Sequence, residues 1–238
     1  MQKESADMLE LINVTSYYGK TPIIHDINVS AKKGQCLCIL GRNGVGKSTL
    51  LRTIMGLTTS MTGTLKINDQ DHSNNPTHVR SNAGLGYVPQ GRRILGKFSV
   101  RENIVLGTFA RDDKKNKLPE SCLKLFPYLA ENLDKRAGLL SGGQQQQLSV
   151  ARALATDPKV LLLDEPTEGI QPNIVEEMRN TLHHLNKDMG ITLILTEQHI
   201  KIARKLADLF VIMDIGRAVA QGPISELSEE LVHKHLTI

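Results

Sequence analysis

The sequence predicts an α/β fold with a mostly parallel sheet and an inserted helical subdomain, and two observations carry that prediction. Short apolar runs alternate with stretches of helical spacing, as in parallel sheets whose strands are joined by helical crossovers. Between about 91 and 156, by contrast, the patterns are helical. The 238 residues are 40% hydrophobic but only 3% aromatic, which suits one aliphatic core covered by helices. We therefore expect a single domain over 1–238, with an α/β core at about 1–90 and 157–238 and a helical subdomain at about 91–156.

Each element rests on the spacing of its apolar residues. Alternating or short continuous apolar runs predict strands at 8–14, 22–29, 35–40 and 85–88. Apolar residues three or four positions apart predict helices at 47–55, 100–109, 118–129 and 144–155. Further strands are expected at 160–163, 191–195 and 209–213, separated by helices at 173–187 and 198–206. Residues 224–238 have the pattern of a short amphipathic helical tail.

The loop between the strand at 35–40 and the helix at 47–55 fits G-x-x-x-x-G-K-[ST], a motif that holds nucleotide phosphates. Its glycines let successive backbone N–H groups converge on phosphate oxygens, and the following helix adds free donors. Lys47 is expected along the β- and γ-phosphates, and the Ser48 hydroxyl on Mg²⁺. The flanking strand and helix argue against a chance glycine loop. The predicted nucleotide-binding residues of this phosphate loop are Gly41, Arg42, Asn43, Gly44, Val45, Gly46, Lys47, Ser48 and Thr49.

An acidic pair follows the apolar run at 161–163. Asp164 is expected at the exposed end of that buried strand, where open α/β sheets bind ligands, and it would hold Mg²⁺ directly or through water. Glu165 is the predicted catalytic residue, which would orient or deprotonate the attacking water. The alternative is a carboxylate pair that merely ends a strand by solvation. Gln90, which closes the strand at 85–88, would by itself be read as an ordinary surface glutamine, but beside the other motifs we expect it to bind ATP as a sensor that contacts Mg²⁺ or its water.

A serine–glycine turn opens the helix predicted at 144–155. It consists of Leu140, Ser141, Gly142, Gly143 and Gln144. Serine is a preferred N-cap, so the turn could serve only to cap the helix. Capping accounts for Ser141 but not for two consecutive glycines followed by glutamine. The turn could therefore also bind a second phosphate.

The phosphate loop, this turn and the acidic pair, in that order, resemble the ATP-hydrolysing subunit of an ABC transporter, over residues 9 to about 222. The resemblance implies a P-loop NTPase core with antiparallel N-terminal strands, ATP and Mg²⁺ as ligands, and a functional dimer. In that family the turn at 140–144 is called the signature, and it contacts the γ-phosphate of ATP held by the opposite subunit. The resemblance also places Tyr18 under the adenine ring, with an exposed turn tyrosine as the alternative.

Two positions depart from the family pattern. Most relatives carry a histidine that contacts the γ-phosphate after the strand at 191–195, whereas this chain has Gln198 there and His199 one position later. Glutamine can donate a hydrogen bond but cannot take up a proton. Gln171 stands where the family usually has an interfacial aspartate. Both departures suggest an asymmetric pair of ATPase subunits, and Gln198 is usual in the subfamily named next.

The resemblance is nearest to importers of branched-chain amino acids and amides, and the segments 38–47, 86–93 and 164–172 look most like the urea-importer subunit. It implies a second ATPase subunit, expected to be a different chain, although a homodimer in isolation stays open. It also implies two transmembrane permeases, one docked near 90–102, and an external binding protein that acts indirectly. Because no apolar run approaches the roughly 18–20 residues that span a bilayer, we expect a peripheral protein at the cytoplasmic face of the membrane. Urea, short amides and branched-chain amino acids all remain open as substrates.

Two alternative functions are weaker. ABC ATPases of DNA repair, chromosome maintenance or translation usually have tandem domains or coiled-coil insertions, and neither pattern is present here. The net charge of +4 is spread among interspersed acidic and basic residues, so no nucleic-acid partner is expected. Nucleotide binding without hydrolysis is disfavoured by Glu165, although Gln198 keeps it open. The cysteines lack metal-ligand spacing, and we expect reduced thiols.

Overall fold

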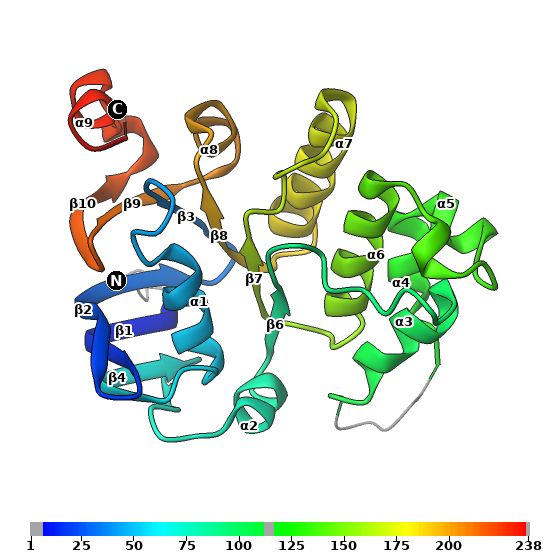
Figure 1. Ribbon diagram of the computed structural model, residues 1–238, viewed down its shortest axis with the longest axis horizontal. Helices are drawn as coiled ribbons and strands as arrows, with labels where there is room; N and C mark the ends of the chain where they lie inside the picture. The colour runs from blue at the N-terminus through cyan, green and yellow to red at the C-terminus, as the bar shows by residue number, and fades with distance from the viewer. Residues whose placement is uncertain (1–6, 112–116, 237–238) are drawn as a thin grey trace, which may run out of the picture.

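The computed structural model describes residues 7–111 and 117–236, and these form two sheets with helices around them (Figure 1). A six-stranded sheet has the order β10-β9-β3-β8-β7-β6, and a four-stranded sheet has the order β2-β1-β4-β5. In the first sheet all pairs are parallel except that of β9 and β10, whereas the second sheet is antiparallel. The predicted α/β class, with a mostly parallel sheet and antiparallel N-terminal strands, is confirmed.

The strands are β1 Asp7–Tyr18, β2 Thr21–Lys32, β3 Cys36–Leu40, β4 Ser60–Ile67, β5 Gln70–Asp71, β6 Leu85–Val88, β7 Val160–Asp164, β8 Thr192–Glu197, β9 Leu209–Asp214 and β10 Arg217–Pro223. The α-helices are α1 Lys47–Met55, α2 Thr77–Asn82, α3 Val100–Thr108, α4 Glu120–Leu125, α5 Pro127–Glu131, α6 Gly142–Leu154, α7 Pro172–His183, α8 Ile200–Leu206 and α9 Glu229–Leu236. A π-helical turn, His184–Asp188, continues α7.

Strand β3 shows why the central strands are continuously apolar. Cys36, Cys38 and Leu40 pack into one hydrophobic cluster together with residues of α3 to α8, whereas Leu37 and Ile39 pack into a second cluster with α1 and the four-stranded sheet. Both faces of the strand are therefore buried, and polar residues have no place in it until the chain leaves the sheet at Gly41. The phosphate loop begins at that point.

Helices α3 to α6 lie together at one end of the molecule, beyond β6 and β7 (Figure 1). They pack mainly through α6, which contacts α3, α4 and α5 and also reaches β6. The division of the chain near residues 91 and 156 stays a prediction. Within the described parts of the chain, no helix combines the length and the apolar character that crossing a bilayer requires.

Several predicted elements are wrong in detail. The helix predicted at 118–129 is two helices, because Pro127 disfavours helical geometry in Phe126, which ends α4. The helix predicted to begin at Gln144 begins at Gly142, because its N-cap is Ser141. Strands β4, β5 and β10 and helix α2 were not predicted.

Candidate functional site

The phosphate loop connects the end of β3 to the start of α1. Gly46 is the N-cap of α1 with φ 109°, and no side chain caps the helix. A Cβ atom on Gly46 would lie 2.9 Å from Ile24 Cδ1, so glycine is required by both backbone and space. The first N–H groups of α1 are consequently left for a ligand that brings acceptors.

Lys47, the first residue of α1, is folded back into the loop and is 4% exposed. Its Nζ donates to the carbonyl oxygens of Gly41 at 2.9 Å and Arg42 at 3.0 Å. It also forms an ion pair with Glu165 Oε1 at 3.1 Å. The predicted phosphate-binding cation and the predicted catalytic carboxylate thus neutralise each other in the free chain.

Asp164 lies next to Ser48, as expected of two ligands of one ion. Ser48 Oγ donates to Asp164 Oδ1 at 2.8 Å, and Thr196 Oγ1 donates to the same oxygen at 2.9 Å. Asp164 is only 1% exposed, which contradicts the exposed strand end expected from the sequence. The carboxylate is buried because β8 extends beside β7, with Thr196 in register with Asp164.

The hydroxyl of Tyr87 approaches the other oxygen of Asp164 at 3.4 Å. Burial and the neighbouring Asp164 carboxylate raise the pKa of Tyr87 to about 12, so its hydroxyl stays protonated and can donate to that carboxylate. The Asp164 carboxylate is therefore held in place by neighbouring hydroxyls, as carboxylates that bind metal ions usually are.

The residues present fit a Mg²⁺ ion. Mg²⁺ takes hard oxygen ligands in an octahedron with bonds of about 2.1 Å, whose edges are about 3 Å long. The 2.8 Å between Ser48 Oγ and Asp164 Oδ1 matches such an edge. No cluster of three or more His, Cys, Asp and Glu side chains occurs among the described residues. One hydroxyl and one carboxylate form the kind of open donor set that Mg²⁺ completes with substrate phosphates and water.

Glu165 is 8% exposed and is held by amides as well as by Lys47. Gln198 Nε2 lies 3.0 Å from each of its carboxylate oxygens and donates to Asn43 Oδ1 at 2.6 Å. Gln90 Nε2 lies 3.4 Å from Glu165 Oε2 and 2.8 Å from Glu168 Oε2. Gln90 therefore contacts the two glutamates rather than the predicted metal ligands.

Gln198 and His199 stand at the switch position, where most relatives carry a histidine that contacts the γ-phosphate. Of the two, only Gln198 reaches the Glu165 carboxylate. His199 is exposed; its backbone N–H donates to Glu197 Oε2 at 3.5 Å, and its carbonyl oxygen accepts from the backbone N–H of Ile202 at 2.9 Å. Whether either residue contacts a γ-phosphate stays a prediction.

Several residues of the phosphate loop line a cavity of about 290 Å³ together with Gln90 and Glu165. Its lining consists of Ile23, Asn43, Gly44, Gly46, Lys47, Ser48, Thr49, Gln90 and Glu165. A larger cavity of about 620 Å³ lies between β1, β2, β9 and β10, but it contains none of the predicted site residues. The residues predicted to bind phosphate line the smaller of these two cavities, so phosphate binding is predicted there.

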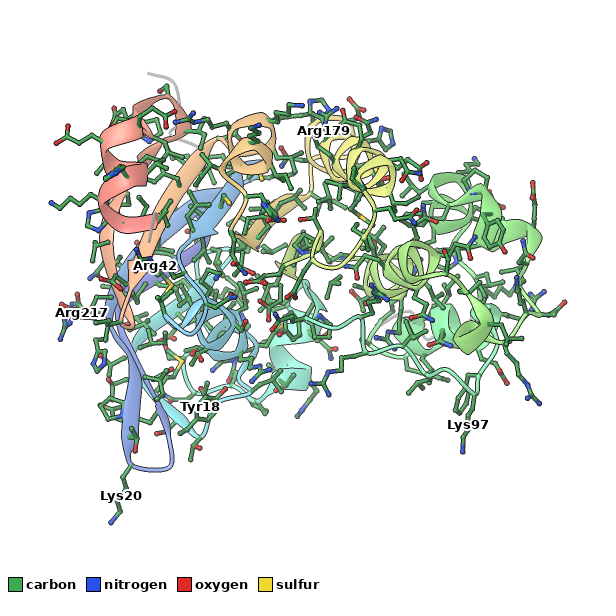
Figure 2. The ribbon with its side chains drawn as sticks, turned by 45° about the horizontal axis from the view of Figure 1, so that its top comes forward. Tyr18, Lys20, Arg42, Lys97, Arg179 and Arg217 are labelled. Atoms are coloured by element: carbon green, nitrogen blue, oxygen red, sulfur yellow. The ribbon has the colours of Figure 1, made fainter. Side chains whose placement is uncertain are left out.

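Tyr18 does not line this cavity. It is 38% exposed at the end of β1, beside the hairpin whose turn carries Lys20 (Figure 2). A hydrogen bond with Tyr18 raises the pKa of Arg52 in α1, so the tyrosine is tied to the helix that follows the phosphate loop. An adenine ring would have to extend out of the cavity to reach it, and the stacking role stays a prediction.

The signature, residues 140–144, forms the first turn of α6. Ser141 Oγ accepts from the backbone N–H of Gln144 at 3.3 Å, and Gln144 Oε1 accepts from that of Ser141 at 2.9 Å. This is a capping box, so the structural role expected of Ser141 is present. Among the described residues, no hydrogen bond or ion pair joins the signature to the phosphate loop, and the signature does not line the 290 Å³ cavity.

The sequence analysis missed Thr196 and Glu197 of this site. Thr196 donates to Asp164 and accepts from the Glu165 backbone N–H at 2.9 Å. Glu197 is 2% exposed, and its Oε1 accepts from Thr167 Oγ1 at 2.5 Å. Asn43 was predicted only as part of the loop. The run Thr196–Glu197–Gln198 ends an apolar strand in the way that Asp164–Glu165 does, and that polar end was the available signal.

Comparison with known proteins identifies the family. Residues 24–168 match the family described as ABC transporter. BraG of Pseudomonas aeruginosa, a high-affinity branched-chain amino acid transport ATP-binding protein, is 38% identical over 213 residues that cover 89% of this chain and 91% of BraG. LivF of Archaeoglobus fulgidus, a probable branched-chain amino acid transport ATP-binding protein, is 32% identical with coverage of 93% and 94%. The lipopolysaccharide export system ATP-binding protein LptB of Escherichia coli is 30% identical with coverage of 92% and 91%.

Solved structures agree with the sequence relatives. The ADP conformation of MJ1267, an ATP-binding cassette of an ABC transporter, has a TM-score of 0.79 at 26% identity and covers 97% of this chain and 99% of its own. A dimeric post-hydrolysis state of the ATP-binding cassette MJ0796, bound to ADP and Pi, has a TM-score of 0.78 at 27% identity and covers 91% and 99%. The matched residues 24–168 exceed half of the chain and include the phosphate loop, the signature and the acidic pair, so the chain belongs to the ABC transporter family as one of its ATP-hydrolysing cassettes.

Proposed function

We propose that this cassette powers an importer of branched-chain amino acids or of small amides such as urea, from the cytoplasmic face of the membrane. The names of BraG and LivF support the amino-acid branch of this proposal. Urea is supported by the resemblance of the segments 38–47, 86–93 and 164–172 alone. LptB, a subunit of an export system, is also 30% identical to this chain. Similarity of the cassette by itself therefore supports a role in transport but does not distinguish import from export.

The observation that carries the ATPase mechanism is the separation of two phosphate-binding elements within one chain. The phosphate loop and Glu165 line one cavity, and Asp164 accepts from Ser48 of that lining, whereas no described contact joins the signature to it. A complete site would therefore need the signature of a second subunit. Dimeric MJ0796 with ADP and Pi supports such an arrangement in a related cassette.

ATP binding would exchange one contact of Lys47 for another. Its Nζ would leave Glu165 Oε1, now 3.1 Å away, for the β- and γ-phosphates. Ser48 and Asp164 would hold Mg²⁺, which supplies charge neutralisation to the phosphates. The N–H groups at the start of α1 would bind the remaining phosphate oxygens.

Glu165 would then act on water. Released from Lys47, it stays within reach of the Gln198 amide, which fixes the orientation of its carboxylate. It would accept a proton as the water oxygen bonds to the γ-phosphorus and the bond to the bridging oxygen breaks, giving ADP and phosphate. Gln90 would exchange its contact with Glu168 for the metal or its water, and Tyr18 would stack on adenine.

A permease would dock between the α/β core and the helical end of the molecule. A cavity of about 300 Å³ opens there, lined by Leu95 in the loop before α3 and by residues of α1, α2, β6, α3 and α6, among them Leu106 of α3. These two leucines are 40% and 38% exposed, and Phe98 and Phe109 beside them in sequence are 45% and 61% exposed. Exposed apolar residues around a cavity are typical of a protein–protein contact, and they extend the predicted docking segment 90–102 into α3.

The experiment is a detergent pull-down of tagged Glu165→Gln protein with ATP from native cells, followed by mass spectrometry. We expect two permeases, a second and different ATPase subunit, and a binding protein. Recovery of the chain alone, or with nucleic-acid or ribosomal proteins, would contradict the importer proposal and favour a non-transport ATPase. The binding protein can then be titrated with leucine, urea and acetamide, and affinity for none of the three would contradict the substrate assignment.

A further inference from the structure

Arg92 follows β6 by four positions, and its side chain lies between two loops that are distant in sequence. Its Nη2 donates to the carbonyl oxygen of Gly169 at 3.1 Å, in the loop that follows the acidic pair. The same guanidinium rests on Gly142, because a Cβ atom on Gly142 would lie only 3.0 Å from Nη1 and 3.1 Å from Nη2. A side chain at the first signature glycine would therefore press against this guanidinium, which would have to shift.

The second signature glycine is required by a different neighbour. A Cβ atom on Gly143 would lie 2.6 Å from Ile174 Cγ2 in α7. The two glycines thus allow close contact with two separate parts of the chain, and neither has a positive φ. Capping by Ser141 explained neither of them.

The backbone of Arg92 is fixed to the helical end of the molecule. Its carbonyl oxygen accepts from Ser149 Oγ of α6 at 2.7 Å, and that of Arg93 accepts from Arg152 Nη2 at 2.8 Å. Arg92 has φ 67° and Arg93 has φ 48°. Such backbone geometry is strained in residues other than glycine, and here the contacts with α6 hold it in place.

A second bond joins the same two segments. Gln90 Nε2 donates to Glu168 Oε2 at 2.8 Å, two residues before Arg92 and one before Gly169. Residues 90–92 and 168–169 are therefore connected twice, and the segment 90–92 also carries the contact with Gly142.

The placement of the Arg92 charge is not explained by the stability of α6. A cation at a helix N-terminus is in general repelled by the positive end of the helix dipole. The bond to Gly169 offsets that repulsion in the free chain. An anion beside the signature would turn this repulsion into a net attraction, because the Arg92 guanidinium and the N-terminus of α6 would both attract the anion.

We propose that Arg92 is a positioning residue that holds the signature glycine Gly142 and the Gly169 loop in one fixed relation, so that both meet the ATP of the opposite subunit together. This inference rests on the proposed function, in which the signature contacts a phosphate across the dimer. It assigns to Arg92 the orientation of the signature and leaves nucleotide binding to the phosphate loop of the same chain.

The test compares Arg92→Ala with Arg93→Ala in the full-length chain, because Arg93 is an adjacent, exposed arginine with the same backbone handedness. Steady-state ATP hydrolysis gives kcat and KM, and binding of a fluorescent ATP analogue at low protein concentration gives the nucleotide Kd of the single chain. For Arg92→Ala we expect a kcat lower by about tenfold, the size expected for one charged hydrogen bond, with Kd changed less than about twofold. Arg93→Ala should keep both values within about twofold.

Arg92→Lys keeps the charge but loses the planar fork, so we expect a kcat lower by about threefold. This variant carries the test if Arg92→Ala does not fold. Equal kcat in Arg92→Ala and Arg93→Ala, or a fall in nucleotide affinity that matches the fall in kcat, would overturn the inference. If neither the wild-type chain nor its complex with the second ATPase subunit hydrolyses ATP, the proposed function fails instead.

Discussion

Glu165 is held by three side chains, and each sets a different property of its carboxylate. Lys47 neutralises its charge, Gln198 fixes its plane through both oxygens, and Gln90 links it to Glu168. Only the first of these contacts competes with phosphate. The carboxylate can therefore lose its counter-ion to ATP and keep its orientation.

Glu165→Gln should lower turnover by at least about a hundredfold, since a general base contributes that much or more. The same change should tighten ATP binding, because Lys47 no longer has to leave a buried ion pair. Turnover and nucleotide affinity are measured on the same preparations. Glu168→Gln is the control, being an exposed neighbour that also contacts Gln90. Comparable turnover in the wild type and Glu165→Gln would remove the assignment of the base.

Glu197 should make stability depend on pH. Burial raises the pKa of its carboxyl above the ordinary value, and the hydrogen bond from Thr167 opposes that rise. The folded chain therefore holds this proton more tightly than the unfolded chain, so the group stabilises the fold at low pH and that stabilisation is lost as pH rises through the folded pKa.

Glutamine does not titrate, so the Tm of Glu197→Gln relative to the wild type should increase as pH rises from about 4.3 towards neutrality. Thermal unfolding of the nucleotide-free protein at a series of pH values gives this difference. The exposed Glu120→Gln supplies the baseline for a surface carboxylate. A difference that does not change with pH contradicts the burial cost of Glu197.

At the scale of elements, the end of β8 organises the site. Thr196 holds Asp164, Glu197 holds Thr167, and Gln198 holds Glu165. Three consecutive residues can do this because the two parallel strands end together, with Asp164 in register with Thr196. A sequence read along one strand contains no register, which is why the sequence could predict the carboxylates but not the side chains that fix them.

The strength of each local pattern explains which elements were predictable. The strands of the parallel sheet are short apolar runs, which the sequence shows directly. The break before α5 also had a signal, the proline at 127, but the sequence analysis did not use it. In α2, by contrast, the N-cap is Pro76 with no side-chain hydrogen bond, and the helix has six residues. Strand β4 is buried only towards its end, and its pairing with β1 is long-range.

Helix α2 is fixed by Arg80, a residue that no sequence pattern singled out. Arg80 is 3% exposed and donates to the carbonyl oxygens of Thr53 at 2.7 Å and Ile54 at 2.9 Å in the last turn of α1. Its other bonds run to the carbonyl oxygens of Asn75 and Ser73, both at 2.8 Å. One guanidinium therefore caps the helix that begins at the phosphate loop.

Arg80→Lys should destabilise the fold by about 2–3 kcal/mol, because an ammonium cannot reach all four carbonyls and leaves buried acceptors unpaired. Denaturant unfolding of the nucleotide-free chain measures the change. Arg101→Lys is the matched control, because the ion pair of Arg101 with Asp134 is exposed and should contribute little. Equal stability of the two variants would mean that α1 does not depend on the Arg80 cap.

At the scale of the whole molecule, the proposed function gives one chain half of each of two composite sites and one face for a permease. The predicted docking face is apolar and lies across the junction of the core and the helical end (Figure 1). Movement between these two parts would change the shape of that face. The same junction contains Gln90 and Arg92, so nucleotide-dependent contacts and permease contacts share one segment of chain.

Leu106→Glu should weaken assembly with the permeases by at least about tenfold, because a carboxylate would be buried in an apolar contact. Val219→Glu is the control, since Val219 is 41% exposed, Leu106 is 38% exposed, and Val219 lies on β10 away from the cavity. Co-purification yield of the permeases is measured together with ATP binding, which both variants should retain. Wild-type yield from Leu106→Glu would place the docking face elsewhere.

Glu165 is permanently tethered beside Lys47, so it competes with every phosphate group for the same ammonium. A tethered competitor acts at an effective concentration that is on the order of millimolar for short links. A nucleotide that has lost its γ-phosphate has fewer contacts with which to resist this competition. The carboxylate proposed to promote cleavage of ATP would thereby also shorten the residence of ADP, and the cassette would return to its starting state without help from another protein.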